Sequence, residues 1–99
     1  MDDFFNREPV ELKSVIFEIA KQLGLEDNII QAKIAEKWVE VVGNNMAKAV
    51  IIKKFDKGTL HLTTSSSAWR TEIKLRKAAI IKLLNEKLGN IVVLELIIR

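Results

Sequence analysis

Residues 50–64, VIIKKFDKGTLHLTT, lie between two segments whose apolar residues recur at helical spacing. The Asp56-Lys57-Gly58 triplet between two strand-like runs predicts a β-hairpin. A helix from about Ser67 to Leu88 and a β-branched stretch, IVVLELIIR, follow the hairpin. A hairpin, a helix and a third strand in this order require a right-handed crossover where the third strand pairs in parallel. The fold class expected is therefore α+β, with helices packed in a second layer against a three-stranded sheet.

The second hairpin strand has a clear inward side, because Leu60 and Leu62 alternate with polar residues. The first strand does not. Either Ile51 and Phe55 or Val50 and Ile52 could face the core, and the sequence leaves this open. In the last strand, one face is wholly apolar and consists of Val92, Leu94, Leu96 and Ile98.

Two further helices are expected before the hairpin. The first covers residues 8–24, EPVELKSVIFEIAKQLG, with Pro9 in its first turn, Gly24 after its last, and an apolar stripe of Leu12, Val15, Ile16, Ile19 and Leu23. The second begins near Asp27 and ends at Gly43, and its buried stripe consists of Ile30, Ile34, Trp38 and Val41 or Val42. A short helical turn, capped by Asn44 or Asn45, follows. The order is α-α-(α)-β-β-α-β.

Composition fits one domain over residues 1–99, with the first eight residues flexible. The absence of cysteine suits a reducing compartment. The acidic N-terminus does not resemble a signal peptide, and the sequence has no apolar run long enough to span a membrane. We expect a cytoplasmic protein that needs no membrane.

Catalysis is not expected. His61 is the only histidine and lies in the middle of a strand, and the sequence contains neither a glycine-rich phosphate loop nor a cluster with metal-ligand spacing. We therefore predict no enzyme activity, no cofactor and no metal.

The net charge of +3 is unevenly distributed. Residues 1–32 carry three basic and seven acidic residues, a balance of −4, whereas the remainder carries 13 basic and six acidic residues, a balance of +7. This asymmetry favours an anionic partner for the basic part, although a solvated surface would show the same pattern. The candidate nucleic-acid-binding residues are the cations of the hairpin and of the following helix: Lys53, Lys54, Lys57, Arg70, Lys74 and Lys77.

The stretch TTSSSAWRTEIKLRK, residues 63–77, combines two possible roles. Ser66 or Ser67 is expected to cap the helix, and free N–H groups in a first helical turn can also hold a phosphate. Trp69 and Trp38 lie at core spacing with Ile73 and Ile34, so we expect both rings to pack in the core, with base stacking by Trp69 a secondary role.

Three segments together resemble one family: KWVEVVGNNMAKAV, the run from DKGTLHLTTSSSAWR to LNEKLG, and IVVLELIIR. The chain is similar to the bacterial DciA family over roughly residues 27–99. We expect most of the residues that match the family pattern to support the fold. These residues are Trp38, Gly43, Gly58, Leu60, Ser66, Trp69 and Gly89.

The resemblance implies a fold like that of K-homology domains and a non-enzymatic role in loading the replicative DnaB-type helicase onto DNA. It also implies the helicase as a partner and single-stranded DNA or another nucleic acid as a ligand. The rival hypothesis is a protein-interaction module that does not contact nucleic acid directly. Self-association is compatible with both.

Two departures from the pattern bear on the binding mode. K-homology domains bind single strands through a Gly-x-x-Gly loop, and here the corresponding turn reads Gly43-Asn44-Asn45-Met46. Longer relatives also carry a basic segment beside the folded domain, which is not found in these 99 residues.

Overall fold

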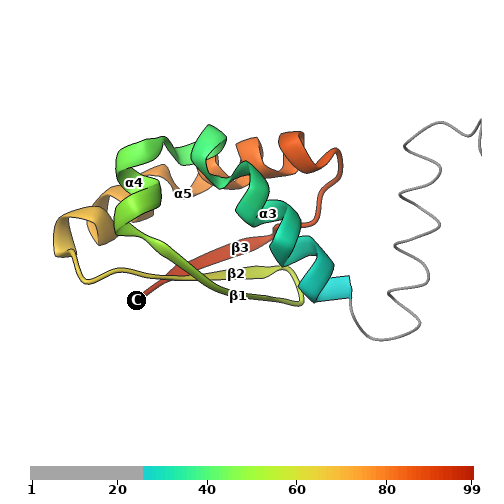
Figure 1. The fold of residues 1–99 in the computed structure, drawn as a ribbon, viewed down its shortest axis with the longest axis horizontal. Helices are drawn as coiled ribbons and strands as arrows, with labels where there is room; N and C mark the ends of the chain where they lie inside the picture. The colour runs from blue at the N-terminus through green and yellow to red at the C-terminus, as the bar shows by residue number, and fades with distance from the viewer. Residues whose placement is uncertain (1–25) are drawn as a thin grey trace, which may run out of the picture.

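The computed structural model describes residues 26–99, which form two layers (Figure 1). The elements are α3 (Glu26–Val42), α4 (Asn44–Ala49), β1 (Ile51–Asp56), β2 (Thr59–Thr63), α5 (Ser67–Leu88) and β3 (Glu95–Ile98). The helix predicted for residues 8–24 and the flexibility predicted for residues 1–8 lie outside the described residues.

The sheet has the order β1-β2-β3, with β1 and β2 antiparallel and β2 and β3 parallel. In Figure 1 the three helices lie on one side of this sheet. The predicted α+β fold with helices against a three-stranded sheet is confirmed. The likeness to K-homology domains stays a prediction.

The core lies between the two layers. The sheet contributes Leu60 and Leu62, as the alternation in β2 predicts, and α5 contributes Ile73, Ile80 and Leu84. The buried residues of α3 are Ile30, Ile34 and Trp38, with Val41 and Val42 partly buried at its end. The helical stripe predicted for this segment is therefore confirmed.

A β-bulge determines which side of β1 faces the core. Ile52 lies opposite Leu62 and Phe55 lies opposite Leu60, so three steps along β1 match two steps along β2. The extra residue reverses the alternation. Val50 precedes the bulge and Phe55 follows it, yet both are buried, whereas Ile51 is 63% exposed. The alternative with Val50 and Ile52 facing the core is therefore right, since Ile52 is partly buried and packs against the core. Of the other alternative only Phe55 is right, because it lies beyond the bulge.

The bulge is tied to α3 by a hydrogen bond. The N–H of Phe55 donates to Oε1 of Gln31 at 3.2 Å. At the turn, the N–H of Lys57 donates to Oδ2 of Asp27 at 3.2 Å. The start of α3 thus provides acceptors for two backbone groups that the strand ladder leaves free.

The hairpin turn has two residues, Lys57 and Gly58, both with positive φ (48° and 87°), as a type I′ turn requires. Asp56, which the sequence suggested as part of the turn, is the last residue of β1 and pairs with Thr59. A Cβ at Gly58 would come within 3.0 Å of Leu94, so glycine is also needed here for close packing.

The ends of α5 follow the sequence closely. Ser66 is the N-cap, and its Oγ accepts the N–H of Trp69 at 3.2 Å, a contact typically worth about 0.5–2 kcal/mol. Gly89 ends the helix in the left-handed conformation, with φ 76°.

The predicted asparagine cap of α4 is wrong. Gly43 is the N-cap, and it makes no side-chain hydrogen bond. With φ 86°, Gly43 redirects the chain within a single residue. Asn44 is already helical, so no asparagine remains outside the helix to cap it.

The last strand is shorter than predicted, because Asn85 holds the residues before it. Its Oδ1 accepts the N–H groups of Val92 and Val93 at 3.1 and 2.8 Å, and its Nδ2 donates to the carbonyl of Val93 at 3.0 Å. Val93 therefore points inward and Leu94 is 68% exposed. Of the predicted apolar face, only Leu96 and Ile98 are buried.

We expect Asn85→Ala to lower the free energy of unfolding by about 2–4 kcal/mol, since unpairing a buried backbone group costs about 1–3 kcal/mol. Asn90→Ala is the matched control. The Asn90 side chain accepts only the exposed N–H of Ile91, so the loss should stay below about 1 kcal/mol. Urea unfolding followed by circular dichroism measures both. Equal losses in the two variants would contradict the role assigned to Asn85.

Candidate nucleic-acid interface

Three of the six predicted cations lie on the hairpin. Lys53 and Lys54 are exposed at the bulge of β1, and Lys57 is exposed in the turn. Lys54 lies opposite His61 in the ladder. We call Lys53, Lys54 and Lys57 the β1 group.

Arg70 serves the fold. Its guanidinium donates to the carbonyl of Thr64 at 2.8 Å. Thr64 is buried, and its Oγ1 donates to the carbonyl of Ala49 at 2.7 Å and accepts the N–H of Ser66 at 3.2 Å. The arginine therefore fixes the loop that leads into α5, and only part of its donor capacity remains for a ligand.

Lys77 forms an ion pair across elements. Its Nζ lies 2.5 Å from Oε1 of Glu95 at the start of β3. The same carboxylate oxygen accepts the N–H of Leu96 at 2.8 Å. The hydrogen bond from Lys77, followed by that from Leu96, lowers the pKa of Glu95. Much of the Lys77 charge is thus compensated.

Lys74 is exposed and makes no ion pair within residues 26–99. We call Arg70, Lys74 and Lys77 the α5 group. Of these three, Lys74 is the residue whose charge is most available to a ligand.

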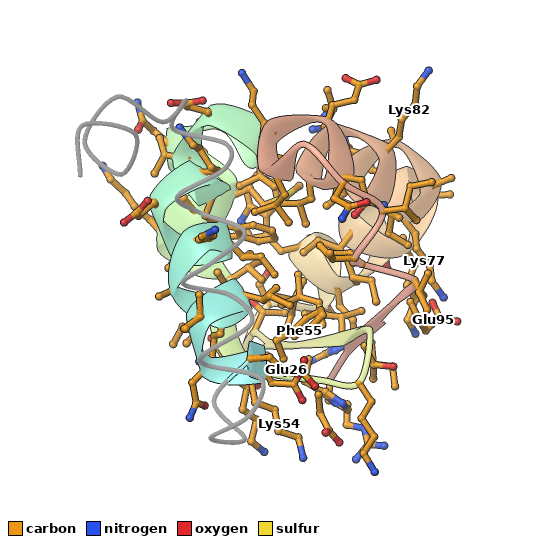
Figure 2. All side chains as sticks on the ribbon, turned by 90° about the vertical axis from the view of Figure 1, so that its right-hand side faces the viewer. Glu26, Lys54, Phe55, Lys77, Lys82 and Glu95 are labelled. Carbon is orange, nitrogen blue, oxygen red and sulfur yellow. The ribbon has the colours of Figure 1, made fainter. Side chains whose placement is uncertain are left out.

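The two groups lie at different edges of the domain. β1 and β3 are the two edges of the sheet, α3 packs on β1, and α5 packs on β3. In Figure 2, Lys77 lies beside Glu95, and Lys54 lies well apart from both. The six cations predicted from the sequence thus lie in two separate groups.

Both tryptophans pack in or against the core, as expected. Trp38 is buried, and its indole Nε1 has no hydrogen-bond partner. Trp69 is half-buried and packs against the core from the first turn of α5. Part of its ring remains accessible.

The turn after α3 does not reproduce a Gly-x-x-Gly loop. Gly43 has the positive φ of a loop glycine, but Met46, three residues later, is a core residue only 1% exposed. A side chain that fills the core at this position cannot let a phosphate backbone approach as glycine would.

His61 is half-exposed on β2 between Lys54 and Ile97. Among residues 26–99, no group of three or more potential ligands could hold a metal ion. Within the same range, no helix has the length and apolar character needed to cross a bilayer.

Sequence reasoning missed Thr64 and Glu95. In the sequence, Thr64 is only a polar residue after a strand. Its hydrogen-bond partners are Ala49, Ser66, Arg70 and Arg99, and two of these lie far from it in the sequence. Glu95 interrupts an apolar run, which is a weak signal of function, and its partner Lys77 lies 18 positions away on another element.

Taken together, the structure is a two-layer α+β domain with cations on a hairpin edge and on one long helix. The class is that of small α+β domains in which helices cover one face of a three-stranded mixed sheet. The model of the family described as Dna[CI] antecedent, DciA, matches residues 11–98. The chain belongs to the DciA family. The family model therefore also covers residues 11–26, which precede the segments that carry the resemblance in the sequence.

Two relatives, one from Mycobacterium and one from Streptomyces, show how much of the chain is shared. A UPF0232 protein of Mycobacterium leprae (strain TN) is 27% identical over 90 residues, which are 91% of this chain and 48% of that protein. UPF0232 protein SCO3875 of Streptomyces coelicolor is 29% identical over 86 residues, 85% of this chain and 45% of its own length. The chain spans about half the length of the relatives it matches.

We expect Lys77→Ala to raise the pKa of Glu95 toward its ordinary value, because the variant removes the main cause of the lowering. A carboxylate with a lowered pKa stabilises the fold above its unfolded-state pKa, and this contribution is lost as the pH falls through the folded-state pKa. Carboxyl-carbon NMR titration of Glu95 measures the change. Lys74→Ala, three residues away and without this ion pair, should leave the titration of Glu95 nearly unchanged, and a similar shift in both variants would contradict the assignment.

Proposed function

We propose that this chain is a non-enzymatic adaptor that helps to load the replicative DnaB-type helicase onto DNA in the bacterial cytoplasm. The observation that carries the proposal is the match of the DciA family model to residues 11–98. The exposed lysines of the hairpin and of α5 are consistent with a role in binding an anionic partner.

A binding experiment with the purified helicase tests this proposal. The full chain and the DnaB-type helicase of the same organism, both treated with nuclease, are mixed and separated by size-exclusion chromatography. We expect the two to elute together without nucleic acid, because an adaptor needs direct contact with the helicase. Separate elution at concentrations up to about 100 µM would exclude any affinity stronger than roughly −5 kcal/mol and would contradict the proposal.

Single-stranded DNA is the nucleic acid we propose, bound through phosphate contacts rather than base reading. The β1 group and Lys74 are exposed and free to move toward phosphates, whereas Arg70 and Lys77 are engaged within the fold. Contacts of this kind are weak, tolerant of sequence and sensitive to salt. Trp69 adds at most the accessible part of its ring.

Because the cations form two groups, the salt dependence reports how many of them the strand reaches. Contacts to all six would give a log–log slope of about −4, whereas contacts to the β1 group alone would give about −2. We expect Lys53→Glu with Lys54→Glu to abolish binding of a fluorescent single strand and Lys74→Glu to weaken it. Neither the double variant nor the single variant removes a side-chain hydrogen bond or ion pair of residues 26–99, so circular dichroism should be preserved. Unchanged affinity in the double variant would contradict the β1 group as the interface.

A protein-interaction module without nucleic-acid contact is the second candidate. The engagement of Arg70 by Thr64 and of Lys77 by Glu95 favours it, since both cations then have structural roles. Retained helicase binding together with no measurable binding of single-stranded DNA would select this candidate.

A further inference from the structure

One face of the sheet has no helix against it in the described part of the chain. In Figure 1, α3, α4 and α5 all lie on the other side. Leu60 and Leu62 of β2 point toward these helices and are buried. Thr59, His61 and Thr63 alternate with them, so they point away from the helices, and all three are partly exposed. We call the outward side chains of the three strands the open face.

The strand register shows which side chains surround His61 on the open face. His61 lies opposite Lys54 of β1 and is the partner of Ile97 in β3. Directly opposite residues point to the same side of a sheet, with Cβ atoms about 4.5–5.5 Å apart in an antiparallel pair. Because the β1 bulge lies between Ile52 and Lys54, both Lys53 and Lys54 oppose His61. The imidazole ring therefore has two lysines on one side and an aliphatic side chain on the other.

The acidic side chains of the open face lie at one end of it. Asp56 and Glu95 flank Thr59, next to the β1–β2 turn. The carboxylate of Glu95 is also paired with Lys77. At the opposite end, Ile51 lies opposite Thr63 and is 63% exposed. The centre of the face is thus cationic and the end away from the turn is apolar.

An aromatic ring between lysines and aliphatic side chains suits a ligand that combines flat rings with phosphates. Single-stranded DNA is such a ligand, because its unpaired bases can stack on aromatic side chains, histidine included, while lysines contact the backbone. A duplex stacks the faces of its bases on one another, so they are not available to the imidazole. The chemistry of the open face therefore favours a single strand.

We propose that His61 is a stacking platform for one base of single-stranded DNA, with Lys53 and Lys54 at the adjoining phosphates. The inference rests on the proposed binding of single-stranded DNA and adds the residue that contacts a base. Stacking tolerates any base, since every base has a π-face, so it agrees with binding that does not read sequence.

The full chain contains a single histidine, so the ring protons of His61 form one separate set of NMR signals. We expect a short strand of deoxyadenosine to move these signals upfield, because protons over the face of a base experience its ring current. An abasic strand of the same length keeps the phosphates and should leave the ring signals nearly unchanged. Both strands should shift the amide signals of Lys53 and Lys54.

Two variants separate the ring from the rest of the imidazole. His61→Thr removes the ring and keeps a residue that favours strands, whereas His61→Phe keeps an aromatic ring. We expect His61→Thr to weaken binding of the deoxyadenosine strand at least about fivefold, the lower limit for the loss of one base stack. His61→Phe should stay within about twofold, as should Thr63→Ala, the matched control on the same face. Affinity for the abasic strand should not change in any variant, and circular dichroism checks the fold.

Several outcomes would overturn the proposal. Shifts at Lys53 and Lys54 without a shift of the His61 ring would exclude stacking and leave the proposed strand binding intact. Equal loss of affinity in His61→Thr and His61→Phe would show that the imidazole acts through its nitrogen atoms. No shift at all with the deoxyadenosine strand would exclude strand binding as well, whereas co-elution with the helicase would still test the adaptor role. Unchanged strand affinity in His61→Thr, together with lost co-elution, would assign the open face to the helicase.

Discussion

The junction at Thr64 holds the two layers in register. Its hydroxyl donates to the carbonyl at the end of α4, its N–H donates to the carbonyl of Arg99 beyond β3, and its carbonyl accepts the guanidinium of Arg70. One buried residue thus joins the helix before the hairpin, the end of the parallel strand and the first turn of α5. Buried polar groups are costly unless they are paired, so the contacts at this junction are mutually dependent. The capping of α5 by Ser66 depends on it too, because the N–H of Ser66 donates to the same hydroxyl.

This junction changes how the basic residues should be understood. A lysine or arginine counted in a sequence contributes one charge wherever it lies, but in the fold Arg70 is oriented by a carbonyl and Lys77 by a carboxylate. Coulomb attraction to a phosphate still acts over several ångströms. Of the six predicted cations, Lys53, Lys54, Lys57 and Lys74 make no side-chain hydrogen bond or ion pair within residues 26–99, and three of these four belong to the hairpin.

Much of the fold could be predicted from local patterns. The bounds of α5, its cap at Ser66 and its end at Gly89 depend on residues adjacent in sequence, and the alternation of Leu60 and Leu62 sets the facing of β2. The errors arose where a distant side chain decides. The bulge in β1 is tied to Gln31 on α3, and the late start of β3 results from Asn85 on α5. The candidate site was predictable as a set of cations, but not its division into two groups, because the strand order that separates them is a property of the whole sheet.

The two edges of the sheet are protected in different ways, which limits how a partner can bind. At β1 the bulge and two lysines disturb the flat row of backbone groups that another strand would need. At the β3 edge, the N–H of Glu95 donates to the carbonyl of Gly58 in the turn, and the N–H of Arg99 donates to the carbonyl of Leu62 on β2. The N–H of Leu96 donates instead to the carboxylate of Glu95. Lys77 holds that carboxylate in place. Addition of a partner strand would have to displace these groups. Partners are therefore expected to contact side chains, such as those of the β1 group, rather than to extend the sheet. On this view Lys53 and Lys54 serve both purposes, since charges that discourage pairing at an edge are also the ones presented to an anionic ligand.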